Sequence, residues 1–136
     1  MAVTLKGRSI SKGIAEGEAL VCRQPIGFNF GIDVDTGTIN EYNHELFGKS
    51  IKDKILLFPH GKGSTGGSYV IYQLARNKTG PRAIINMTTE AIIAVGAIMG
   101  GIPVIDQLEK DPYEIISDGD HVKVDAVHGL VTIEKG

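Results

Sequence analysis

The chain has 136 residues and a mass of 14.5 kDa, so we expect residues 1–136 to form a single domain with one core that needs neither disulfides nor a structural metal. Hydrophobic residues make up 42% and charged residues 22%, values close to globular averages that exclude intrinsic disorder. The 14 basic and 16 acidic side chains leave a formal charge of -2, so the composition favours neither nucleic acid nor an anionic membrane surface as a partner.

The first part of the chain predicts β structure followed by an irregular loop. Residues 18–22 alternate like a short strand, and residues 25–40 are rich in turn residues, so we expect an ordered loop or a set of tight hairpins there. Phe28 and Phe30 in this loop either bury in the domain's own core or contact a partner. Before this strand, turns are predicted at three glycines, Gly7, Gly13 and Gly17.

Two strand and helix units follow. Residues 55–58 are a continuous apolar run ended by Pro59, which is typical of a central strand covered on both faces. A glycine-rich stretch leads from it into a predicted helix over residues 68–76. Residues 83–85 predict a second buried strand, and residues 91–99 predict a helix of small side chains.

The last part of the chain completes a sheet. Residues 104–105 predict a third short strand, and residues 122–125 and 130–133 predict a hairpin around Gly129. Two strand and helix units bracketed by β segments predict a three-layer α/β domain with a partly parallel sheet and a β flank.

The single cysteine, Cys22, cannot form an internal disulfide, and alone it holds neither zinc nor an iron–sulfur cluster. We expect it to be buried as a small hydrophobic residue in a reducing compartment. The histidines are scattered, so no metal site is predicted. The first seven residues lack a basic segment followed by an apolar one, and no apolar run approaches the ~20 residues of a membrane helix. These features predict a soluble cytoplasmic protein.

The segment over residues 59–68 carries the strongest functional signal, because it joins a buried strand to the start of a helix. Unpaired amides at the positive end of the helix dipole suit an anion, and glycines let a ligand approach the backbone. The glycine spacing matches the dinucleotide pattern, which alone is a weak signal. The segment is not a Walker loop, because its Gly-Lys pair stands at the front and is followed by Gly63.

Ser64 has two possible roles. It, Thr65 or Ser68 could cap the helix, as Ser and Thr usually do at this position. Alternatively, Ser64 lies exposed at the loop tip and accepts a proton, its oxyanion stabilised by neighbouring amides and the helix dipole. Lys62 could bind a phosphate or carboxylate, and His60 could either accept a phosphoryl group or line the wall of the site.

Stretches spread along nearly the full length of the chain match those of a known family: residues 7–13, 15–21, 48–51, 59–64, 68–70, 83–86, 90–98 and 102–103, with Asp33, Thr36, Gly37 and His44. On these residues the chain resembles the small subunit of the aconitase X group. The resemblance implies the swivelling β/β/α domain of aconitase, its domain 4, supplied here as a separate subunit. It also implies a large partner subunit that carries a four-iron four-sulfur cluster on its own cysteines, which agrees with the single Cys here.

The archaeal members of this group imply an activity. They dehydrate (R)-5-phosphomevalonate, a phosphorylated hydroxy acid, to trans-anhydromevalonate 5-phosphate in an archaeal variant of the mevalonate route to isoprenoids. The family's proposed proton acceptor falls on Ser64, while the partner's cluster iron would draw off the hydroxyl group. We therefore select Lys62 and the amides of Gly63, Thr65 and Gly66 as candidates to hold the substrate's anionic groups.

Other functions stay open on sequence grounds. Gly27 and residues 65–67 depart from bacterial relatives, some of which act on cis-3-hydroxyproline. A phosphocarrier swivelling domain is an alternative, because residues 118–125 and 129–133 resemble the closing hairpin of that fold. Those domains place a reactive histidine directly after a serine, whereas Thr65 follows Ser64 here. A non-catalytic module that senses an anion is a further alternative.

Overall fold

The computed structural model describes residues 2–135, which form eight strands and three helices. The strands are β1 (Ala2–Lys6), β2 (Arg8–Ser11), β3 (Ile14–Val21), β4 (Ile55–Phe58), β5 (Ala83–Asn86), β6 (Val104–Asp106), β7 (His121–Asp125) and β8 (Leu130–Glu134). The helices are α1 (Gly66–Asn77), α2 (Ala91–Gly100) and α3 (Pro112–Ile115). None of the helices in this range has the length and apolar character needed to cross a membrane.

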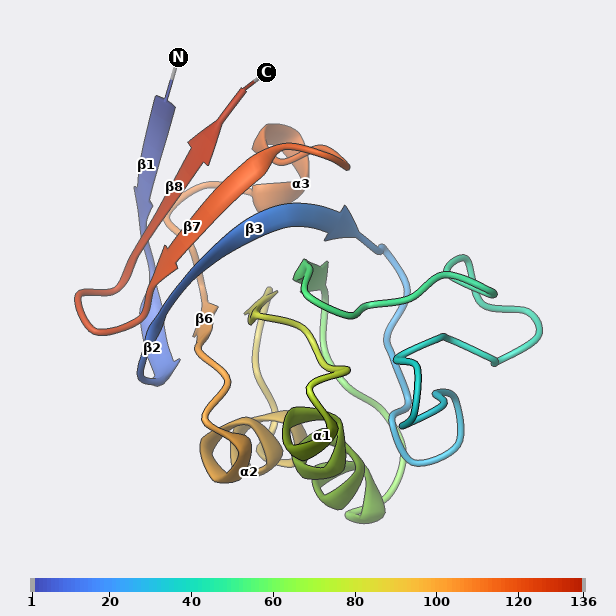
Figure 1. The fold of residues 1–136 in the computed structure, drawn as a ribbon. Helices are drawn as coiled ribbons and strands as arrows, with labels where there is room; N and C mark the ends of the chain where they lie inside the picture. Colours follow the sequence, from blue (N-terminus) through green and yellow to red (C-terminus); the bar gives the residue numbers. More distant parts are fainter. Residues whose placement is uncertain (1, 136) are drawn as a thin grey trace.

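The strands follow one another in the order β1-β8-β7-β3-β4-β5-β6-β2. Strand β3 belongs to both halves of this sheet: its first part pairs antiparallel with β7, and its last three residues pair parallel with β4. The antiparallel half lies over the parallel strands, and α1 and α2 cover the opposite side of those strands (Figure 1). The predicted three-layer α/β architecture with a partly parallel sheet and a β flank is confirmed.

The apolar run of β4 is explained by its place between two cores. Leu56 and Phe58 pack toward the helices, whereas Ile55 and Leu57 pack toward the antiparallel layer. All four side chains are buried. A strand in this position needs apolar residues on both faces, which is why its sequence shows no alternation. The core on the helix side also contains Ile71, Leu74, Ile93, Ala97, Phe28 and Ile39.

The start of the chain differs from the prediction. Strand β3 begins at Ile14, four residues earlier than expected, so the turn predicted at Gly17 is wrong. A side chain at Gly17 would bring its Cβ within 3.2 Å of the Asp53 carbonyl oxygen, which gives this glycine a packing role inside the strand. The strands β1 and β2 and the short helix α3 were not predicted as elements.

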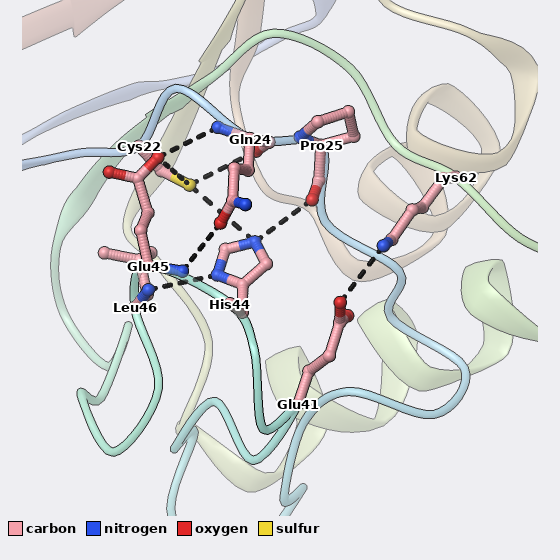
Figure 2. A network of polar contacts seen from close by, with 8 residues as sticks. All are labelled: Cys22, Gln24, Pro25, Glu41, His44, Glu45, Leu46 and Lys62. Atoms are coloured by element: carbon pink, nitrogen blue, oxygen red, sulfur yellow. Dashed lines mark hydrogen bonds and ion pairs between the residues drawn. The ribbon is translucent and has the colours of Figure 1, made fainter.

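The segment over residues 22–54, between β3 and β4, is one long loop, which extends beyond the residues 25–40 for which the sequence predicts a loop or tight hairpins. Residues 23–25, at its start, are hydrogen-bonded to residues 44–45, further along the same loop (Figure 2). The Glu45 carboxylate accepts hydrogen bonds from the amides of Arg23 and Gln24, and the Gln24 side-chain oxygen accepts one from the Glu45 amide at 2.6 Å. His44 is buried, with Nε2 3.0 Å from the Pro25 carbonyl oxygen.

Candidate active site

The segment over residues 59–65 lies at the carboxyl ends of the parallel strands, where α/β sheets commonly bind ligands. It leaves β4 and enters α1, and it is fastened to the loop over residues 22–54. The Ile26 amide donates to the His60 carbonyl oxygen at 3.3 Å, and the Lys62 amide donates to the Ile26 carbonyl oxygen at 3.1 Å. The two loops therefore form one unit at this edge of the sheet.

Ser64 lies exposed in this segment and does not cap α1. Its Oγ accepts a hydrogen bond of 2.9 Å from Nδ2 of Asn29. The N-cap residue is Thr65, whose side chain makes no capping hydrogen bond, and the Ser68 hydroxyl donates to the Ile92 carbonyl oxygen instead. Thr65 thus occupies the predicted capping position, but none of the three side chains makes a capping hydrogen bond. Sequence reasoning did not find Asn29, because nothing in the pattern links it to a serine 35 residues away.

Among the described residues, the backbone amides around Ser64 have no hydrogen-bond acceptor. Within residues 2–135, the amides of Gly63, Ser64, Thr65 and Gly66 donate to no protein acceptor, whereas the Gly67 amide bonds to the Ser64 carbonyl oxygen. The other long helix, α2, differs: the Glu90 carboxylate accepts bonds from its second and third amides. The first turn of α1 contains no acidic residue. The positive end of its helix dipole, next to Ser64, is therefore not neutralised by a carboxylate of that turn.

Lys62 precedes Ser64 by two residues and has an ion-pair partner of its own. Its Nζ is 3.1 Å from Oε2 of Glu41, and both side chains are partly exposed (Figure 2). This pair lines a pocket of about 260 Å³ with Gly27, Asn29, Phe30 and Gly63. Of the predicted binding residues, Lys62 and Gly63 therefore share one pocket, whereas Thr65 lines a separate hollow against α2. Gly66 lies near the serine, since a Cβ there would be 3.7 Å from Ser64 Oγ.

A buried carboxylate anchors a guanidinium at the same edge of the sheet. Asp106 ends β6, its side chain is inaccessible, and it accepts two bonds from Arg8, at 2.9 and 2.8 Å, and one from the Thr89 amide at 2.7 Å. Burial acts to raise the pKa of Asp106, but the hydrogen bonds from Arg8 and Thr89 outweigh it and hold the pKa below its usual value. Arg8 remains half exposed.

The remaining titratable candidates do not form a metal site. Within the described range, no three His, Cys, Asp or Glu side chains come together as a ligand group. Cys22 is fully buried, and burial raises the pKa of its thiol to about 12, against the thiolate that an iron–sulfur cluster requires. The donor set of this chain therefore does not fit such a cluster. His60 is exposed, and its Nδ1 bonds the Gly61 carbonyl oxygen at 2.8 Å.

Comparisons with known proteins agree on one family. The family model for the aconitase X swivel domain matches residues 4–133. The phosphomevalonate dehydratase small subunit of Methanosarcina mazei is 56% identical over 98% of this chain and 92% of its own, and that of Pyrococcus furiosus is 50% identical over 95% and 94%. The crystal structure of Thermococcus kodakaraensis aconitase X in its holo form matches with a TM-score of 0.91 and 45% identity, over 98% of this chain and 99% of that one. The chain therefore belongs to the aconitase X swivel-domain family.

Proposed function

We propose that this chain is the small subunit of a phosphomevalonate dehydratase, a hydro-lyase that converts (R)-5-phosphomevalonate to trans-anhydromevalonate 5-phosphate. Relatives from several archaea, 45% to 56% identical to this chain, carry that name. The cis-3-hydroxyproline alternative is not favoured by these names. A phosphocarrier role is not favoured either, because the family is different and Thr65 follows Ser64.

The observation that supports this function best is the environment of the Ser64 hydroxyl group. Its hydroxyl is exposed, takes no part in capping, and lies among open amides at the positive end of α1. These are conditions that stabilise an oxyanion and so let a serine act as a base. We infer that Ser64 Oγ takes the proton from the carbon next to the substrate carboxylate. The electrons of that C–H bond form the double bond, and the hydroxyl group leaves from the neighbouring carbon.

The anionic ends of the substrate need donors close to this serine. The candidates are Lys62 and the backbone amides of Gly63, Thr65 and Gly66. In this proposal the amides contribute more to anion binding than Lys62 does, because Glu41 already neutralises the Lys62 ammonium group. A substrate phosphate or carboxylate that enters the pocket next to Lys62 would compete with Glu41 for its ammonium group.

The remaining parts of the proposal concern the partner and the setting. We assign the four-iron four-sulfur cluster, with its Lewis-acid chemistry, to a large subunit, since the donor set of this chain does not fit it. Neither subunit is then active alone. We also keep the cytoplasmic location and the single domain over residues 1–136 as predictions.

Two experiments test this function. Capture of the partner from native cells, followed by iron and sulfide analysis, is expected to yield an iron–sulfur protein, and its absence would contradict the heteromeric assignment. In the purified complex, Ser64→Ala is expected to assemble normally and to lose nearly all turnover of phosphomevalonate. Ser117→Ala, an exposed serine before β7, is the matched control and should keep full activity. Retained activity in Ser64→Ala would remove the proton acceptor from the proposal.

A further inference from the structure

We infer that Asn29 is a positioning residue that prepares Ser64 to ionise, an inference that rests on the proposed function of Ser64. The Asn29 Nδ2 group can only donate hydrogen bonds, so Ser64 Oγ is the acceptor in the 2.9 Å contact. The serine's own proton is then directed away from Asn29. A donor to this oxygen stabilises its charged form more than its neutral form, and so favours loss of the proton.

The backbone of the loop holds the Asn29 amide in place. The Gly31 amide donates to the Gly27 carbonyl oxygen at 3.1 Å, which closes a turn around Asn29, and the neighbouring Phe28 is buried with 2% exposure. On its other side, Asn29 Oδ1 lies against Gly63, where a Cβ would stand 2.6 Å away. The structure thus places the amide nitrogen toward the serine and the amide oxygen toward Gly63.

This hydrogen bond is not needed to hold the two loops together. The bonds between Ile26 and the backbone of His60 and Lys62 fasten them independently, and so does the ion pair between Glu41 and Lys62 (Figure 2). We therefore expect the loops to stay docked when the Asn29 amide is removed. The consequence of the Asn29 bond should fall on the protonation of Ser64.

The charged and titratable side chains next to this segment have partners other than Ser64. Lys62 pairs with Glu41, Glu90 caps α2, and His60 bonds the Gly61 carbonyl oxygen. Across residues 2–135, none of these side chains hydrogen-bonds Ser64 Oγ, whose side-chain partner is Asn29. A change in the protonation of residue 64 on loss of the amide can therefore be traced to Asn29.

A thiol at position 64 can report on this effect without turnover. In Ser64→Cys, the other cysteine is silent, because burial raises the pKa of Cys22 to about 12. The pH dependence of alkylation by iodoacetamide, measured on the full chain without its partner, gives the thiol pKa. We expect Asn29→Ala in this background to raise that pKa by about one pH unit. Asn77→Ala is the matched control, because Asn77 Nδ2 bonds the Val34 carbonyl oxygen of the same loop at 3.1 Å.

Turnover provides the second readout. With Ser64 in place, we expect Asn29→Ala, which adds no charge to the pocket, to lower kcat by about 10- to 100-fold, to leave KM within about twofold, and to move the rise of kcat to higher pH. An unchanged thiol pKa in the Asn29→Ala background, or an equal shift in the Asn77→Ala control, would overturn the inference while the role of Ser64 stands. Full activity of Ser64→Ala would instead contradict the proposed function, and the thiol pKa would still show whether Asn29 acts on position 64.

Discussion

Asn29 and Gly63 lie so close together that a side chain at residue 63 would displace the Asn29 amide. A Cβ on Gly63 would stand 2.6 Å from Asn29 Oδ1, well inside van der Waals contact. Gly63 also has a φ of +100°, which L side chains rarely adopt. The absence of a side chain at residue 63 therefore serves both the turn before α1 and the position of the amide that bonds Ser64.

Gly63→Ala is expected to damage function more than stability. Backbone strain should lower the free energy of unfolding by about 1–2 kcal/mol. The displaced Asn29 amide should in addition lower turnover of the complex at least tenfold. Gly48→Ala is the matched control, because Gly48 has a φ of +81° but nothing within 4 Å of an added Cβ. It should show the strain cost in denaturant unfolding and normal turnover, and equal turnover in the two variants would show that the Asn29 contact has no role.

The two phenylalanines of the loop should respond very differently to truncation. Phe28 is 2% exposed and packs against Phe58 with ring centroids 5.9 Å apart, whereas Phe30 is 91% exposed. We expect Phe28→Ala to cost about 3–5 kcal/mol of unfolding free energy. Phe30→Ala should stay within about 0.5 kcal/mol of the parent. Chemical denaturation of the two variants decides this, and a large loss in Phe30→Ala would place that ring in the core.

The core elements could be predicted from the sequence because their signals are local. The apolar runs at residues 55–58 and 83–85 have no alternation because both faces are covered, and the hairpin at residues 122–133 alternates because one face is solvated. In contrast, β1 owes its existence to β8, with which it pairs more than 120 residues away in the chain. The four-residue helix α3 is too short to show a period.

The candidate site was predicted only in part, for a related reason. The glycine segment and Ser64 are contiguous, so their pattern was visible. The side chains that act on this segment come from distant positions, with Asn29 on Ser64 and Glu41 on Lys62. The pair of Arg8 and Asp106 joins residues 98 positions apart. No periodicity records such contacts, since they are set by how β2 and the loop fold back onto the parallel strands.

The starts of the two long helices should differ in their sensitivity to mutation. Glu90 bonds two amides of α2, at 3.1 and 3.2 Å, so Glu90→Ala should lower the free energy of unfolding by about 1 kcal/mol. Thr65 stands at the corresponding position of α1 and makes no such bond, so Thr65→Ala should lower it by less than about 0.5 kcal/mol. Thermal or denaturant unfolding measures both. A loss as large in Thr65→Ala would mean that its hydroxyl caps α1 in solution.

The pair of Arg8 and Asp106 should give the fold a defined dependence on pH. Because the pKa of Asp106 lies below its usual value of 3.8, its ionised form stabilises the fold above about that pH, and the stabilisation is lost as the pH falls through the lowered pKa. In Arg8→Met the carboxylate stays buried without its cation, so its pKa should rise. The unfolding free energy should fall by about 1.5–3 kcal/mol at neutral pH.

This deficit in Arg8→Met should shrink as the pH is lowered toward 4, because protonation removes the buried charge. Arg82→Met is the matched control, because it removes an arginine from an exposed ion pair. Arg82 Nε lies 3.8 Å from Asp53 Oδ1, and both side chains are more than half exposed. It should cost no more than about 0.5 kcal/mol at any pH in this range. Denaturant unfolding at several pH values distinguishes the two variants. A deficit in Arg8→Met that stays constant with pH would mean that Arg8 stabilises the fold through packing and not through the charge of Asp106.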